Sequence, residues 1–283
     1  MPLQLFEDAF GDWRNANFLG YASDLAYLPE AVAAPKFQEL LGMDARLISR
    51  DNTQCYVLTN AEHIVLAFRG TEAPTTIDGL KDWLLTDAMN LLIVPEGRLG
   101  TDFIAAGVSA RFHQGFISAL AEIWDPVDEA VAAELKASER PLWITGHSLG
   151  GALALLAGWL FVRKFVNVHQ IITFGGPMIG NKDAVQAFDS GLKGKIFRYV
   201  DPRDPVPQLP TMSLVANEFY HCEQMMCLGE MAQGSFWKNL AVNSVGGVFT
   251  GGGVDAAWKH VMDCVGAHSM TTYLTYLKNR LNA

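Results

Sequence analysis

Cysteine and charge are both scarce in this chain. Charged residues make up 18% of its 283 residues, and only four cysteines occur, Cys55, Cys222, Cys227 and Cys264. A chain of this length can bury a large core without covalent crosslinks, so we expect free thiols. The cysteine spacing matches no zinc motif, and the histidines include no H-x-x-x-H pair on a helix. No metal site is therefore expected.

Long hydrophobic segments are also missing. The longest, Leu149 to Val162, is shorter than the roughly 20 residues that a membrane-spanning helix needs, and Arg163 and Lys164 follow it. The first ten residues contain neither a basic region nor an apolar run, so they do not look like a secretory signal. We expect no transmembrane segment, and either a cytoplasmic location or export by a route other than general secretion.

Positive charge is in deficit. Lysine and arginine number 21 against 30 aspartates and glutamates, which gives a formal net charge of −9. Such a chain repels nucleic-acid backbones and anionic membrane surfaces, so nucleic acid is not expected as a partner. Hydrophobic residues, in contrast, make up 50% of the sequence, which rules out disorder for most of the chain and allows one large core.

Apolar runs of strand length alternate with longer helical patterns. This alternation predicts one α/β domain over residues 1–283, in which helices cover a mainly parallel sheet. The strand-like runs are Gln54 to Leu58, His63 to Phe68, Leu142 to Thr145, Gln170 to Phe174 and Ile196 to Val200. The helical segments are Asn17 to Leu28, Val108 to Lys136 with a break at Pro126, Gly150 to Phe165, Lys182 to Phe188, and Ser269 to Leu281.

Two stretches do not fit this alternation. Residues 72–107 are predicted to form a short amphipathic insert, and residues 243–254 contain five glycines, which predicts a flexible segment. Both are too long to be tight connections, and long insertions in compact domains are often functional.

The strongest chemical signal is Gly146-His147-Ser148-Leu149-Gly150, which fits G-x-S-x-G. It follows a predicted strand and opens a predicted helix, the setting of a nucleophile elbow that exposes a serine hydroxyl above the sheet. The alternative is an ordinary glycine-rich turn in which Ser148 caps the helix. We expect His147 to be a packed or hydrogen-bonded neighbour of the elbow and not a catalyst.

A serine nucleophile needs a histidine base and a carboxylate, and on this fold both follow it in the chain. Asp201 and Asp204 lie just beyond a predicted strand, at the sheet edge where such sites gather. The base could be His268, which directly precedes the last helix, or else His221 or His260. His169 precedes its strand and would lie at the opposite edge.

Several further motifs follow one another along the chain, namely AFRGT at 67–71, KDW at 81–83 with Asp87, HQGF at 113–116, ITGHSLGG at 144–151, TFGGPMIGN at 173–181, DPVP at 204–207, and His268 with Tyr273. In these segments and in this order the chain resembles the class 3 lipases, the fungal-type triacylglycerol lipases of the α/β-hydrolase fold. The resemblance covers about residues 17–281.

This resemblance implies the roles of individual residues. Ser148 would be the nucleophile, Asp204 the acid of the triad and His268 the base, while Thr71 and the N–H of Leu149 would form the oxyanion hole. Residues 72–107 lie where the family carries its lid. No cofactor is implied, and the partners would be a lipid ester and, transiently, a lipid surface.

The sequence is thus interpreted as a lipase or esterase that forms an acyl-enzyme on Ser148 and cleaves acylglycerols. A phospholipase A1 or a short-chain carboxylesterase is the alternative within the same chemistry. A noncatalytic lipid-binding protein that keeps the fold is the alternative of another class.

Overall fold

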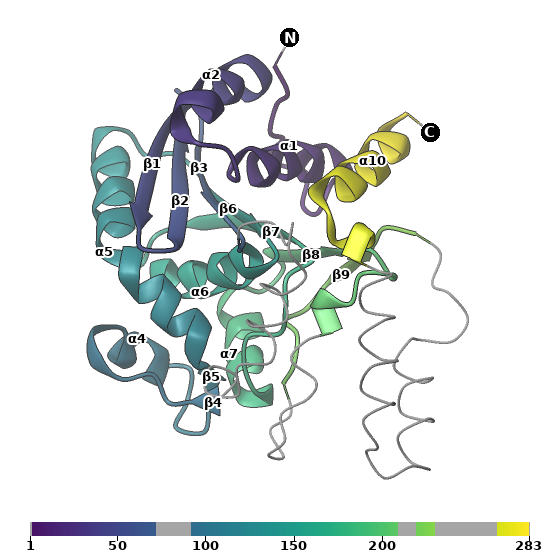
Figure 1. The fold of residues 1–283 in the computed structure, drawn as a ribbon. Helices are drawn as coiled ribbons and strands as arrows, with labels where there is room; N and C mark the ends of the chain where they lie inside the picture. Colours follow the sequence, from purple (N-terminus) through teal and green to yellow (C-terminus); the bar gives the residue numbers. More distant parts are fainter. Residues whose placement is uncertain (1, 72–91, 209–218, 230–264, 283) are drawn as a thin grey trace, which may run out of the picture.

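A seven-stranded sheet forms the centre of the molecule (Figure 1). The computed structural model describes residues 2–71, 92–208, 219–229 and 265–282. In spatial order the strands are β1 (Asp44–Arg50), β2 (Thr53–Thr59), β3 (Ile64–Phe68), β6 (Leu142–His147), β7 (Val168–Phe174), β8 (Ile196–Val200) and β9 (Met225–Cys227). β1, β2 and β3 pair antiparallel, and every pairing from β3 to β9 is parallel.

Helices cover both faces of this sheet (Figure 1). On one face α1 packs against α10 and β6, and on the other α5 packs against α6 and β2. The helices of the described residues are α1 (Trp13–Leu25), α2 (Glu30–Leu41), α4 (Gly100–Ile104), α5 (Gln114–Ala137), α6 (Leu149–Arg163), α7 (Lys182–Gly191) and α10 (Met270–Leu281). Short 3-10 turns are η1 (Gly97–Leu99), η2 (Val206–Gln208) and η3 (Val265–His268). The chain thus forms three layers.

The central strands are apolar at nearly every position because both of their faces are covered. Leu66 and Ile144 point to the core on the α5 and α6 side, while their neighbours Val65 and Trp143 belong to the core on the α1 and α10 side. Successive side chains of a strand point to opposite faces, so a strand between two helical layers reads as a continuous apolar run.

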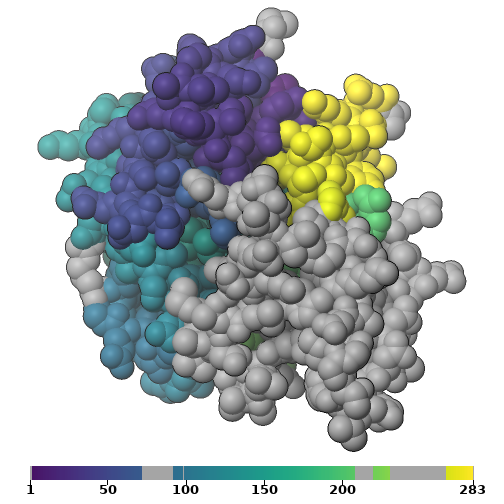
Figure 2. Space-filling model, viewed as in Figure 1, coloured from purple at the N-terminus to yellow at the C-terminus, as the bar shows by residue number. Residues whose placement is uncertain are grey.

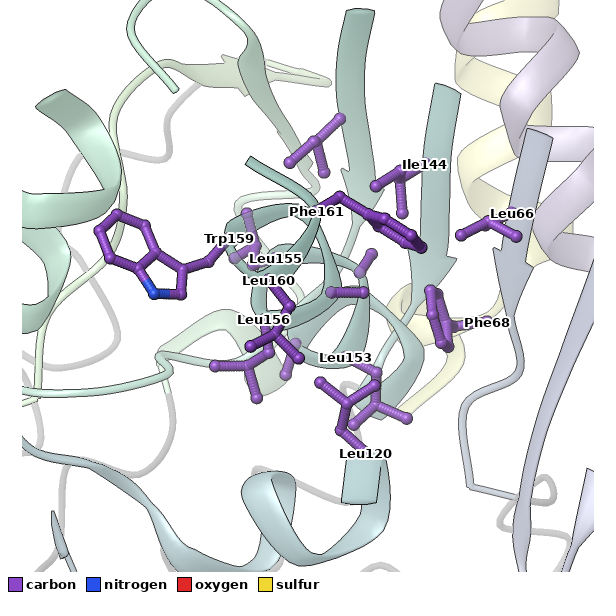
Figure 3. Close-up of a cluster of buried hydrophobic side chains, with 14 of the residues drawn as sticks. Leu66, Phe68, Leu120, Ile144, Leu153, Leu155, Leu156, Trp159, Leu160 and Phe161 are labelled. Carbon is purple, nitrogen blue, oxygen red and sulfur yellow. The ribbon is translucent and has the colours of Figure 1, made fainter. Parts of the chain in front are cut away.

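Helix α6 is the most deeply buried helix of the described chain. Its apolar side chains, including Leu153, Leu156, Leu160 and Phe161, fill the space between the sheet and α5 (Figure 3). A helix that is hydrophobic on all sides belongs in a core or a membrane, and here the core accounts for it. None of the helices in the described ranges is both long enough and apolar enough to cross a membrane.

The last helix packs against the first one on the α1 side of the sheet. Helix α10 lies against α1, so that C-terminal and N-terminal surfaces adjoin (Figure 2). The buried residues of α10 are Met270, Tyr273, Leu274 and Leu277, one face of an amphipathic helix. This packing brings the residues that precede α10 to the sheet.

The five strands predicted from the sequence all occur, with ends that differ by at most two residues. The sequence did not indicate β1 or α2, and two predictions about α5 were wrong. The helix begins at Gln114 and not at Val108. No break occurs at Pro126, because α5 continues through it. Ile123, Trp124 and Val127 are buried on both sides of the proline, and their packing offsets the one hydrogen bond that it removes.

Parts of other predictions lie outside the described residues. Cys55, Cys222 and Cys227 are free thiols, as expected, while Cys264 is outside. The glycine-rich residues 243–254 and residues 72–91 of the insert are outside as well. The described remainder of the insert forms the short strand β4 (Leu92–Ile93), which pairs with β5 (Phe112–His113), and then η1 and α4.

Candidate active site

Ser148 lies on a sharp turn between β6 and α6. Its backbone has φ 58° and ψ −130°, a conformation that non-glycine residues rarely adopt. A Cβ atom at Gly146 would overlap the backbone of Gly150, and one at Gly150 would overlap the carbonyl of Phe68 in β3. Both glycines are therefore required for strand and helix to approach this closely. The arrangement is that of a nucleophile elbow.

His268 and Asp204 are hydrogen-bonded to each other at the same edge of the sheet. The distance from His268 Nδ1 to Asp204 Oδ2 is 2.8 Å, and both side chains are buried. An ionised carboxylate can only accept, so Nδ1 carries the proton and Nε2 is left with a lone pair. A neutral imidazole oriented in this way can act as a general base.

Asp204 is fixed by two further donors. The N–H of Val206 donates to Oδ1 at 2.9 Å, and the hydroxyl of Tyr273 donates to Oδ2 at 2.7 Å. Burial, followed by the negative charge of Asp204, raises the pKa of Tyr273 well above its usual value, so its hydroxyl remains a donor. The role of Tyr273 was not foreseen from the residues alone. It entered only as part of the terminal segment, His268 with Tyr273, that resembles the lipase family.

The rival carboxylate, Asp201, has a different partner. The guanidinium of Arg203 donates two hydrogen bonds to it, from Nη2 to Oδ2 at 2.7 Å and from Nε to Oδ1 at 3.1 Å. Its backbone N–H donates to the Tyr273 hydroxyl at 3.3 Å. Asp201 therefore lies next to the site, but its carboxylate is bound to an arginine instead of an imidazole.

The rival histidines are also placed elsewhere. His221 Nε2 bonds the carbonyl of Pro207, and His169 bonds the carbonyl of Glu7 at 3.0 Å. His260 lies outside the described residues. Among the described histidines, the one bound to a carboxylate beside the elbow is His268.

Ser148 and His268 are not hydrogen-bonded to each other within the described residues. Catalytic hydrogen bonds are often long without substrate and tighten when it binds. The N–H of Ser148 donates to the carbonyl of Phe174 at 3.0 Å, which anchors the elbow to β7. A Cβ at Gly175, the next residue, would lie 3.1 Å from His268 Nδ1. Hence Phe174 at the end of β7 binds the elbow, and the residue after it leaves no room for a side chain beside the imidazole.

Leu149 follows the serine in the chain, and Thr71 follows Gly70, which lies close to it. Leu149 is the first residue of α6, where a backbone N–H has no partner within the helix and the helix dipole favours negative charge. Thr71 follows Gly70, whose added Cβ would be 3.1 Å from Ser148 Cβ. Both residues thus belong to backbone that borders Ser148.

Within the described residues no group of His, Cys, Asp and Glu side chains could hold a metal ion.

Three histidines, the buried His113 and His147 and the half-buried His221, are held neutral. Burial lowers the pKa of His113 to about 4, and burial, followed by the charge of Arg198, lowers that of His221 to about 3. Burial, followed by the charge of His268, holds the pKa of His147 well below its usual value. Each ring would have to gain a proton on unfolding in mild acid.

The family model described as "Lipase (class 3)" matches residues 65–214, more than half of the chain. Among curated proteins, the chain is 30% identical over 150 residues to a secreted mono- and diacylglycerol lipase of Gibberella zeae, covering 52% of this chain and 44% of that protein. It is 29% identical over 165 residues to a chloroplastic phospholipase A(1) of Arabidopsis thaliana, covering 55% and 35%. The chain spans less than half the length of these relatives.

Solved structures resemble the fold over a larger share. The Lip2 lipase of Yarrowia lipolytica aligns with a TM-score of 0.61 at 19% identity, covering 78% of this chain and 83% of that one. The Rhizomucor miehei lipase propeptide complex aligns with a TM-score of 0.60 at 19% identity, covering 77% and 68%. At such identities the likeness concerns the arrangement of sheet and helices.

The neutral histidines should make the protein sensitive to acid. Below about pH 6.5 the unfolded chain binds protons that the folded rings do not, so the free energy of unfolding should fall as the pH falls toward 4. For His221, the loss should approach about 1.4 kcal/mol per pH unit. Urea titrations between pH 7 and 4 should therefore show a shallower loss for His221→Gln than for wild type. Equal slopes would mean that His221 is protonated in the folded state.

Proposed function

The chain belongs to the class 3 lipase family and has the α/β-hydrolase fold predicted from its sequence, and on this basis we propose that it hydrolyses carboxylic esters of lipids. The observation that carries the proposal is the buried hydrogen bond between His268 and Asp204 at the edge where the elbow presents Ser148. A serine, an oriented imidazole and a carboxylate are the groups that acyl transfer requires.

In the proposed reaction, Ser148 Oγ attacks the ester carbonyl carbon while His268 Nε2 takes the hydroxyl proton. Asp204 holds the imidazole tautomer and stabilises the imidazolium that forms. The tetrahedral oxyanion would be held by the N–H groups of Thr71 and Leu149. His268 then returns the proton to the leaving alcohol, and water releases the acid from the acyl-enzyme by the same steps in reverse.

The proposed substrates are acylglycerols. The name of the Gibberella zeae relative supports this class, while the name of the Arabidopsis relative supports a phospholipase A1 as the second candidate. Both reactions break the same kind of bond, so the two candidates differ in the alcohol and not in the chemistry. A noncatalytic lipid-binding protein is disfavoured, since it would not need a buried carboxylate with three hydrogen-bond donors.

We also propose that residues 72–107 form the lid. In their described part, Leu92 and Ile93 are half-buried in β4, and Ile93, Val94 and Leu99 line a hollow of about 450 Å³ together with the start of α5. The apolar residues Trp83, Leu84, Leu85 and Leu91 lie outside the described residues. Because the net charge is −9, attachment to a lipid surface would be mainly hydrophobic and tolerant of salt.

Replacing the nucleophile should abolish turnover without unfolding the protein. We expect Ser148→Ala to lower kcat on p-nitrophenyl esters by about 10⁴ to 10⁶, with an unchanged melting temperature. A fluorophosphonate should label wild type at Ser148 alone, as mapped by mass spectrometry of peptides. Labelling of another serine would contradict the assignment.

The two aspartates should differ in their effects. Asp204→Asn should lower kcat by about 10⁴, because an amide at this position stabilises the wrong tautomer of His268. Asp201→Asn is the matched control, since it loses the Arg203 ion pair but leaves the imidazole bond intact. Steady-state rates on one soluble ester give kcat for both variants. If Asp201→Asn lowers kcat more than Asp204→Asn does, the acid of the triad is Asp201.

The lid predicts a response to the physical state of the substrate. The wild-type rate on one ester should rise when the ester passes its solubility limit, and the double change Leu91→Ser with Leu92→Ser should remove this rise. Val108→Ser is the control, because Val108 is exposed and lies just outside the segment. If the wild type shows no rise and the double change lowers only the melting temperature, the segment is part of the core.

A further inference from the structure

His147, the residue between Gly146 and Ser148, has a hydrogen bond at each ring nitrogen. Nδ1 is 2.8 Å from the hydroxyl oxygen of Tyr27, and Nε2 is 2.6 Å from the main-chain carbonyl oxygen of His268. The side chain is buried. It is therefore a hydrogen-bonded neighbour of the elbow, one of the two possibilities that the sequence left open.

The partners determine where the protons lie. A carbonyl oxygen can only accept, so Nε2 of His147 must carry a hydrogen. In a neutral ring Nδ1 is then the acceptor, and the hydroxyl of Tyr27 must donate to it. Burial keeps the pKa of His147 well below its usual value, so the ring stays neutral. Tyr27 therefore selects the tautomer that can bind the carbonyl of His268.

The bond from His147 holds the backbone of His268. Asp204 binds the ring of His268 at Nδ1, while His147 binds its main chain, and the centroids of the two imidazole rings are 4.4 Å apart. Because His147 directly precedes Ser148, the residue that carries the nucleophile is tied to the residue that carries the base. Asp204 alone would orient the ring without fixing the backbone from which it projects.

Tyr27 links this bond to the end of β3. It lies just beyond the end of α1, and a Cβ atom added at Gly70 would overlap its hydroxyl and lie 2.6 Å from the carbonyl oxygen of His147. The hydroxyl of Tyr27 is thus packed against the backbone that leads directly into Thr71. A series of contacts therefore connects Gly70 to Tyr27, Tyr27 to His147, and His147 to His268.

Resting on the proposed function, we propose that His147 is a positioning residue for the general base. Its Nε2–H holds the main chain of His268 at a fixed place relative to Ser148, and Tyr27 keeps the ring in the tautomer that can do so. A neutral ring is suited to this place, since His268 gains a positive charge during acyl transfer and a second charge beside it would oppose that step.

The test compares two substitutions of similar size. His147→Met keeps the apolar bulk but has no donor, so the base can shift and kcat should fall about 100-fold while KM stays within about 2-fold. In His147→Gln the side-chain amide can place an N–H near the position of Nε2, and we expect kcat within about 10-fold of wild type. The rate of inactivation by a fluorophosphonate should follow kcat in both variants.

Two tyrosines supply a matched pair. The hydroxyl of Tyr56 donates to the carbonyl of Leu28 at 2.7 Å, and Leu28 is the residue that follows Tyr27. Tyr27→Phe and Tyr56→Phe each remove one tyrosine hydroxyl bond near the end of α1, and both should lower the melting temperature. Only Tyr27→Phe should lower kcat, by about 10-fold.

The proposal is overturned if folded His147→Met turns over at the wild-type rate, or if His147→Gln is no faster than His147→Met. Should His147→Met fail to fold, equal kcat values for Tyr27→Phe and Tyr56→Phe would overturn it instead. A wild-type protein that neither hydrolyses esters nor reacts with the fluorophosphonate would contradict the proposed function itself. Failure of the proposed function can thus be told apart from failure of the positioning role, because the first is seen in wild type and the second only in the variants.

Discussion

The close contact between β6, α6 and β3 is the constraint on which the rest of the site depends. Gly146 and Gly150 leave no room for a side chain, and between them Ser148 adopts a positive φ. Such strain persists only where the surroundings hold it, and here the buried helix α6 provides a large apolar contact on one side. The hydrogen bond from Ser148 N–H to Phe174 holds the elbow from the direction of β7.

Around this elbow, polar groups are buried together and satisfy one another. Asp204 is fully buried but accepts bonds from His268, Val206 and Tyr273, so its desolvation is offset by three donors. Its neighbours come from two distant parts of the chain, the loop after β8 and the start of α10. The packing of α10 against α1 therefore positions the imidazole as well as the core.

The fold was largely predictable because its central strands are buried on both faces. β3, β6, β7 and β8 read as apolar runs, and the all-apolar α6 follows the elbow. Elements at the edge of the sheet and on its outside were harder to predict from the sequence. β1 has mostly exposed or half-buried positions, so its sequence lacks a clear apolar pattern, and α5 continues through Pro126 because its packing outweighs the local preference of a proline.

For the site, the sequence by itself determined the position of Ser148, because the elbow is a local motif whose glycines and serine are adjacent in the chain. It also limited the carboxylate to Asp201 or Asp204, which follow one strand. Only the tertiary structure decided which of them meets an imidazole, since Arg203 binds one and His268 the other. The contacts of Tyr27, His147 and Tyr273 were likewise decided by tertiary structure, because each is a hydrogen bond between elements far apart in sequence and no local pattern encodes such a pairing.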